Sequence, residues 1–131
     1  MRLLTFLCLA ITGCGNLPNE QPEANAPKLT LEEKREATYV QQTYIVNAIK
    51  GYYLKNNRFP ERLDDLVKKP KDFTEWKGPL LDAPDLPKDK WGRDFKMKIT
   101  APKNPREIRI EVRSAAQDGK FGTDDDIVIA G

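Results

Sequence analysis

The 131-residue sequence predicts an α+β domain in which one long amino-terminal helix packs on a small antiparallel sheet of about three strands. Two patterns indicate this fold. Apolar residues between 37 and 52 recur every three or four positions, which is the period of a helix, whereas those between 95 and 129 alternate with charged residues, as in a half-buried strand. A helix laid across the apolar face of such a sheet buries both sets of residues at once.

The long helix is predicted to begin at Thr30 and to end near Asn57. Thr30 and Glu33 have the spacing of a capping box, in which each side chain bonds the other residue's backbone N–H. The residues predicted to form its buried stripe are Ala37, Val40, Tyr44, Ile45, Ala48, Ile49 and Tyr52.

Residues 60–67 predict a short second helix with Pro60 in its first turn. A proline-rich irregular segment follows, in which we expect Trp76 and Trp91 to pack into the domain. Residues 95–99 and 108–113 then predict two strands, and the connection from Pro102 to Pro105 makes them a hairpin. Residues 127–129 predict a third strand. Residues 30–131 are therefore expected to form one domain with a single small core.

An acidic loop precedes the last predicted strand. Between Ser114 and Ile127 it carries four aspartates and two glycines. Carboxylates this close repel one another unless a cation or solvent neutralises them. Ca²⁺ accepts about six to eight oxygen ligands in flexible geometry, and glycines let the chain curl around it. The loop therefore predicts calcium binding, with a solvated turn as the alternative. Its spacing differs from that of an EF-hand loop.

The beginning of the chain has the layout of an export signal. Arg2 is followed by an apolar run over residues 3–11 and by small residues before Cys14. That run is too short to span a bilayer of about 30 Å. Residues 11–14, Ile-Thr-Gly-Cys, resemble a bacterial lipobox, so Cys14 is predicted to carry acyl chains such as palmitate. An ordinary secretory signal is the alternative.

The predicted organisation is a signal peptide over residues 1–13, a lipidated Cys14 with a disordered tether over residues 14–29, and a domain over residues 30–131. Because Cys8 lies in the signal and Cys14 carries lipid, no thiol is left for a disulfide. The chain has no histidine and a formal net charge of +2. It therefore lacks the commonest zinc ligand, and it has no electrostatic footprint for nucleic acid.

Several short motifs follow one another in a characteristic order. They are Arg58-Phe-Pro60, Trp76-Lys-Gly-Pro79, Trp91-Gly92, and Asp118-Gly-Lys-Phe-Gly-Thr123 ahead of Asp125-Asp-Ile127. In this order they resemble the carboxy-terminal domain of the major pseudopilin of type II secretion systems, over roughly residues 37–129. The resemblance implies a type IV pilin-like α+β fold whose last loop binds calcium.

The resemblance also implies which residues hold the ion. It places Asp118 and the cluster Asp124, Asp125 and Asp126 at the metal-loop positions of the family. We favour Asp124 and Asp126 over Asp125, because alternate residues entering a strand point the same way. Ser114 is predicted to add a further oxygen.

The start of the chain departs from the family pattern. Pseudopilins open with a basic leader, a processing Gly and a long apolar helix containing a Glu, whereas a lipobox and a proline-rich tether stand in their place here. Lys90 also replaces the family's Pro before Trp91. We therefore expect the pseudopilin head on a lipid anchor, and Gly15 after Cys14 favours the periplasmic face of the outer membrane by resemblance to known sorting rules.

The expected function is that of a membrane-anchored, non-enzymatic structural or interaction lipoprotein, accessory to protein secretion or pilus-like machinery. The alternative is a periplasmic lipoprotein that uses the same fold to bind a peptide, glycan or protein. A metal-dependent hydrolase is disfavoured, because the chain has no His and Ser114 has no base near it in the sequence.

Overall fold

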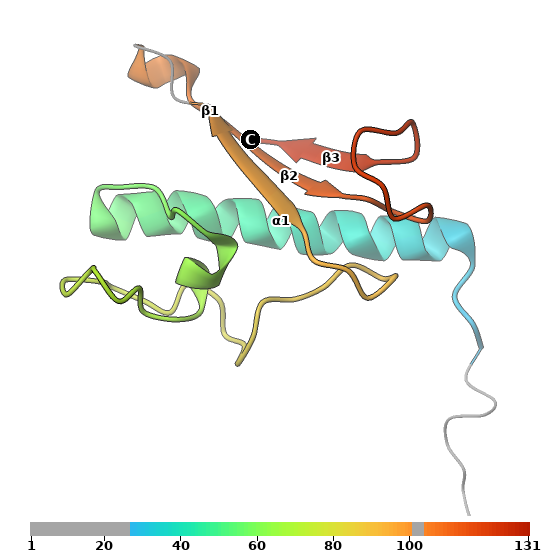
Figure 1. Cartoon of the computed structure of the whole chain (residues 1–131), viewed down its shortest axis with the longest axis horizontal. Helices are drawn as coiled ribbons and strands as arrows, with labels where there is room; N and C mark the ends of the chain where they lie inside the picture. The colour runs from blue at the N-terminus through green and yellow to red at the C-terminus, as the bar shows by residue number, and fades with distance from the viewer. Residues whose placement is uncertain (1–26, 101–103) are drawn as a thin grey trace, which may run out of the picture.

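A computed structural model describes residues 27–100 and 104–131 of the protein. A long helix is followed by an irregular segment, residues 57–95, and then by three strands. One short 3-10 turn lies within the irregular segment, and a second lies between the first two strands. The elements are α1 (Leu31–Asn56), η2 (Leu63–Leu66), β1 (Lys96–Thr100), η3 (Pro105–Glu107), β2 (Arg109–Ser114) and β3 (Ile127–Ala130). Figure 1 shows the sheet on one side of α1 and the irregular segment below it.

The start of α1 forms the predicted capping box. The Thr30 hydroxyl accepts a hydrogen bond from the Glu33 N–H at 3.2 Å, and the Glu33 carboxylate accepts one from the Thr30 N–H at 2.7 Å. The bond from the Thr30 backbone lowers the pKa of Glu33. The helix ends at Asn56, and Asn57 after it adopts the left-handed conformation common beyond a last turn.

Replacing Thr30 with alanine is expected to destabilise the protein by about 1 kcal/mol, because one of the first backbone N–H groups of α1 loses its acceptor. The free energy of unfolding in urea measures the effect. Thr74→Ala is the matched control, because Thr74 is also exposed but lies in the irregular segment and caps no helix. Equal stability of the Thr30→Ala and Thr74→Ala proteins would contradict a contribution from the cap.

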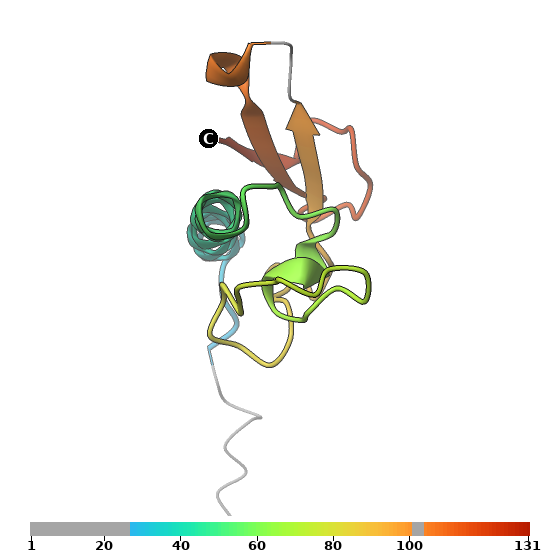
Figure 2. The ribbon, with the colours of Figure 1, turned by 90° about the vertical axis from the view of Figure 1, so that its left-hand side faces the viewer.

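The sheet is antiparallel and has β2 at its centre. Its order is β1-β2-β3, with Met97 opposite Val112, Ile99 opposite Ile110, and Val112 opposite Ile129. These apolar residues lie on the same face, which packs on α1. Figure 2, which looks along the helix, shows α1 beside both the sheet and the irregular segment. The predicted α+β fold and its three strands are confirmed.

The core is contributed by the helix, the irregular segment and the sheet together. Its buried members are Ile45, Val46, Ala48, Ile49, Tyr52, Leu63, Leu66, Leu81, Phe95, Ile110 and Val112. Trp76 packs against this core and donates its indole N–H to the Asp65 carbonyl at 3.0 Å. Trp91 is half-buried and lies outside that group.

The predicted stripe of α1 is wrong at two positions. Val40 and Tyr44 are 67% and 52% exposed. The buried positions include polar Thr38 and Gln42 instead, because each bonds a backbone group distant in sequence. The Thr38 hydroxyl accepts from the Lys90 N–H at 3.2 Å. The Gln42 amide donates to the Val112 and Ile127 carbonyls at 2.8 and 2.7 Å, which ties α1 to β2 and β3.

The predicted second helix is a four-residue 3-10 turn, η2, and Pro60 lies before it rather than in its first turn. A longer α-helix would need residue 70 to donate to the Leu66 carbonyl, but Pro70 has no N–H; this carbonyl accepts a hydrogen bond from the Leu80 N–H at 2.7 Å instead. The Asp65 carboxylate caps the start by accepting from the Glu61 and Arg62 N–H groups.

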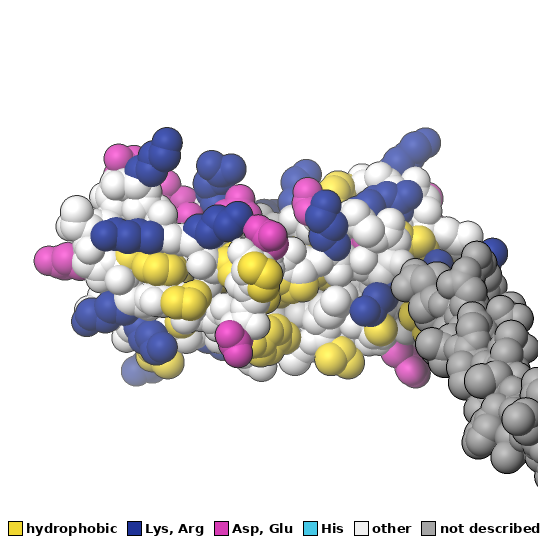
Figure 3. Space-filling model, turned by 90° about the horizontal axis from the view of Figure 1, so that it is seen from below, with side chains coloured by type: hydrophobic (Ala, Val, Ile, Leu, Met, Phe, Trp, Pro, Cys, Tyr) yellow, Lys and Arg dark blue, Asp and Glu magenta, His cyan; other side chains and the backbone are white. Residues whose placement is uncertain are grey.

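The surface of the described residues is mixed in character. Figure 3 shows apolar side chains in separate patches among charged ones, on the face seen from below in Figure 1. Across residues 27–100 and 104–131, no helix is both long and apolar enough to cross a bilayer. The predicted signal peptide, Cys14, Gly15 and most of the predicted tether lie outside the described residues, as do residues 101–103 of the predicted hairpin connection.

Candidate metal site

The acidic loop between β2 and β3 brings three carboxylates together. One oxygen each of Asp118, Asp125 and Asp126 lies within 4.8 Å of the others. The Asp126 side chain is only 4% exposed, whereas Asp118 lies at the surface. Clustered carboxylate oxygens are the kind of donor set that Ca²⁺ prefers.

Backbone N–H groups of the loop hold these carboxylates in place. Asp125 accepts from the Asp118 N–H at 3.0 Å, Asp118 accepts from the Lys120 N–H at 2.7 Å, and Asp126 accepts from the Gly122 N–H at 2.7 Å. Gly119 and Gly122 allow this winding, because both have positive φ angles, of 73° and 90°.

The charge of the cluster is only partly compensated. Arg113 lies 3.1 Å from the Asp126 carboxylate, and it is the one basic side chain that forms an ion pair with the cluster within the described part of the chain. Hydrogen bonds from the Thr123 hydroxyl and the Asp118 N–H lower the pKa of Asp125. Asp125 is therefore ionised at neutral pH, as a ligand of a hard cation must be.

The structure does not gather every residue that the sequence predicted. Asp124 is exposed and lies outside the cluster, whereas Asp125, the less favoured residue, lies inside it. The alternation argument does not apply here, because β3 begins only at Ile127 and the aspartates precede it in a turn. Ser114 is turned elsewhere: its hydroxyl donates to the Asp89 carboxylate at 2.7 Å. Whether any of these residues binds metal stays a prediction.

Asp89 is a residue of this region that the sequence analysis missed. It is 4% exposed. One carboxylate oxygen accepts from the N–H groups of Trp91 and Arg93 at 3.0 and 2.8 Å, and the other accepts from the Ser114 hydroxyl. Asp89 therefore joins the tight turn around Trp91-Gly92 to the end of β2. The only signal in the sequence was the position of Asp89 just before that motif.

Arg93 extends the same connection into the acidic loop. Its guanidinium donates to the carbonyl of Ala116, a residue held at a φ of 46°. Gly119 lies directly against this guanidinium, because a Cβ built on it would be 2.7 Å from Arg93 Cζ. The first half of the acidic loop is thus supported by Arg93.

Gly119→Ala is expected to destabilise the protein by about 1 kcal/mol more than Gly122→Ala does. Both changes place a Cβ at a positive φ, which costs about 1–3 kcal/mol. Only the Cβ at Gly119 meets Arg93, whose guanidinium must move and lose its hydrogen bond to the Ala116 carbonyl, whereas the Cβ at Gly122 meets nothing within 4 Å. Urea unfolding of both variants measures the difference. The excess should vanish in an Arg93→Ala background, and its persistence there would contradict this account.

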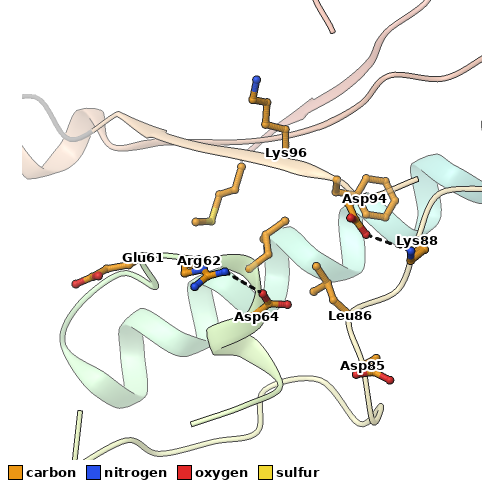
Figure 4. A pocket seen from close by; sticks show the side chains of 11 residues that line it. Glu61, Arg62, Asp64, Asp85, Leu86, Lys88, Asp94 and Lys96 are labelled. Atoms are coloured by element: carbon orange, nitrogen blue, oxygen red, sulfur yellow. Dashed lines mark ion pairs between the residues drawn. The ribbon is translucent and has the colours of Figure 1, made fainter. Parts of the chain in front are cut away.

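A separate pocket opens between η2, the irregular segment and β1 (Figure 4). Its volume is about 530 Å³, and its apolar lining comes from Leu63, Leu86, Phe95 and Met97. Arg62 lies 3.8 Å from Asp64, and Lys88 lies 3.7 Å from Asp94, so these four charged side chains of the lining form two ion pairs. The described residues that line it include no hydroxyl, thiol or imidazole group.

A long helix packed on a three-stranded antiparallel sheet, with an acidic loop ahead of the last strand, defines a pilin-like domain. Residues 29–130 match the family model described as "Type II secretion system (T2SS), protein G". The chain belongs to this family.

Two individual proteins illustrate the relationship. Over 89 residues the chain is 37% identical to the type II secretion system core protein G of Aeromonas hydrophila; the match covers 62% of this chain and 57% of that protein. The chain thus spans little more than half of that relative. The fold matches the crystal structure of the major pseudopilin from the type 2 secretion system of enterohaemorrhagic Escherichia coli, with a TM-score of 0.59 and 26% identity over 79% of this chain and 90% of the other.

Proposed function

We propose that the protein is a structural, non-enzymatic component of the type II secretion machinery, and that it presents a calcium-stabilised pilin-like head on a lipid anchor. The observation that carries the proposal is the family match over residues 29–130, which includes the whole of the described fold from α1 to β3. Family membership favours this role over that of a periplasmic lipoprotein with no part in secretion.

Calcium is the proposed ligand of the acidic loop. Asp118, Asp125 and Asp126 would hold it through one oxygen each, and the loop already orients these carboxylates toward one another through its own N–H groups. When bound, Ca²⁺ neutralises the mutual repulsion of the three carboxylates. Binding would thereby stabilise the connection between two neighbouring strands, because the loop joins β2 directly to β3.

The lipid anchor is proposed from the lipobox that ends at Cys14. Each buried lipid methylene contributes about 0.8 kcal/mol, so several acyl chains give stable attachment where one chain gives marginal attachment. Gly15 after Cys14 supports the periplasmic face of the outer membrane. The partners of the head would then be other secretion-system proteins at that surface.

The test is to cross-link the intact protein in its native cell envelope and to identify what co-purifies with it. Components of the type II secretion system are expected to be enriched. Cys14→Ser is the matched variant, because it removes the acylated thiol without touching residues 27–131. It should shift the protein from the membrane fraction to the periplasm or leave an unprocessed precursor. Recovery of the variant in the membrane after normal processing would contradict the anchor.

The secretory role has its own contradicting result. If the protein is intact and membrane-bound, yet neither cross-links to secretion-system components nor alters export of the system's substrates when it is deleted, the proposed role is wrong. The anchor and the role are thus tested separately.

A further inference from the structure

The outer face of the sheet, which points away from α1, is strongly basic. Its charged residues are Lys96 and Lys98 on β1 and Arg109, Glu111 and Arg113 on β2, and we refer to these five residues as the basic face. Uncharged Thr100, Val128 and Ala130 lie on the same side of the sheet. Lys96 lies opposite Arg113, and Lys98 lies opposite Glu111. The alternation that buries Ile110 and Val112 against α1 therefore gathers four cations and one carboxylate on the other side.

Most of these cations have no acidic partner. Across residues 27–100 and 104–131, Lys96, Lys98 and Arg109 form no ion pair, and all three are exposed. Arg113 is the exception, because it pairs with Asp126 at the end of the acidic loop. Lys96 and Arg113 lie directly opposite each other on β1 and β2, and like charges in such positions repel one another. A ligand with negative charge would relieve that repulsion.

The basic face is hollowed where it meets the acidic loop. A cavity of about 430 Å³ lies between Lys96, Lys98, Glu111, Arg113 and Phe121. Phe121 is 42% exposed, and the Lys96 ammonium lies 4.9 Å from the centre of its ring. The hollow thus combines cations with one aromatic wall, which suits a chain that carries both carboxylates and an apolar side chain.

We propose that the basic face is the docking surface for an acidic segment of a partner protein. Lys96, Lys98 and Arg109 contact its carboxylates, Phe121 contacts an apolar side chain, and Glu111 accepts a backbone N–H. Charge complementarity selects this partner. A flat bilayer of anionic lipids fits less well, because it cannot enter the hollow and would face Glu111. The inference goes beyond the secretory role and requires neither that role nor calcium.

The experiment measures binding of fluorescently labelled poly-L-glutamate to the purified protein by anisotropy. The double variant Lys96→Glu/Lys98→Glu is expected to bind about tenfold or more weakly. The matched control is Lys69→Glu/Lys71→Glu, which makes the same charge change at two exposed lysines of the irregular segment. The control should change the dissociation constant by less than about twofold. Binding of the wild-type protein should also weaken as salt is raised.

Two further variants separate a loss of binding from a loss of folding. Lys96→Gln/Lys98→Gln introduces no new repulsion on the strand and should still weaken binding. Glu111→Gln should tighten binding, because it removes the one carboxylate from the face. Equal losses in the two double-glutamate variants, or no binding of poly-L-glutamate, would overturn the proposal. Binding of the basic face to phosphatidylserine vesicles without binding to poly-L-glutamate would also overturn it, in favour of a membrane surface.

Discussion

Replacing Asp89 with alanine is expected to lower the free energy of unfolding by about 3 kcal/mol. Its carboxylate accepts three hydrogen bonds, from the N–H groups of Trp91 and Arg93 and from the Ser114 hydroxyl. Ser114 is completely buried, so its hydroxyl is left without an acceptor in the variant. An unsatisfied buried polar group costs about 1–3 kcal/mol, and the turn around Trp91 loses its cap in addition.

Urea unfolding measures this loss, with Asp82→Ala as the matched control. Asp82 lies in the same irregular segment but is exposed, and its removal should leave stability unchanged. Asp89→Asn should fall between the two, because an amide oxygen can still accept from the backbone N–H groups. If Asp89→Ala were as stable as Asp82→Ala, the connection between the Trp91 turn and β2 would not support the fold.

Asp126→Ala is expected to abolish the rise in melting temperature that calcium causes in the wild-type protein. The variant removes one of the three clustered oxygens, and with it the carboxylate that Arg113 and the Gly122 N–H hold. A ligand that binds only the folded state stabilises it by RT ln(1 + [L]/Kd), or about 2.7 kcal/mol at a hundredfold excess over Kd. That is a large share of the stability of a small domain.

The readout for Asp126→Ala is the difference between its melting temperatures in calcium and in chelator. A lower stability of the variant in chelator therefore does not affect the comparison. Asp118→Ala should give the same loss and is the milder change, because Asp118 is exposed. Asp124→Ala is the matched control, since its carboxylate lies outside the cluster. A variant at Asp124 that lost the calcium response while Asp126→Ala kept it would contradict the proposed ligand set.

The sequence was sufficient for the elements whose pattern is local. The capping box of Thr30 and Glu33 located the start of α1, and the alternation around Met97 and Val112 identified two paired strands. Burial of Gln42 was not predictable in the same way, because it depends on the Val112 and Ile127 carbonyls, which are distant in sequence. A hydrophobicity pattern cannot show that a polar side chain is buried for its bonding partners.

The same distinction holds for the candidate site, where local features were predictable and contacts between distant residues were not. The run of aspartates located the loop in which three carboxylates cluster, but the choice among Asp124, Asp125 and Asp126 depended on where β3 begins and on which carboxylate meets the Asp118 N–H. Asp89 lies 25 positions before Ser114, and only the fold brings the two together. Such contacts between distant residues carry no local signature.

The central claim, a secretion-family head stabilised by calcium in its acidic loop, is tested most directly by thermal unfolding of the purified wild-type protein during a calcium titration. The melting temperature should rise with calcium until the site is saturated. Magnesium at equal concentration should have little effect, because it demands near-ideal octahedral geometry and gives up water reluctantly. The same melting temperature in chelator and in calcium, up to concentrations of several millimolar, would show that the loop is a solvated turn.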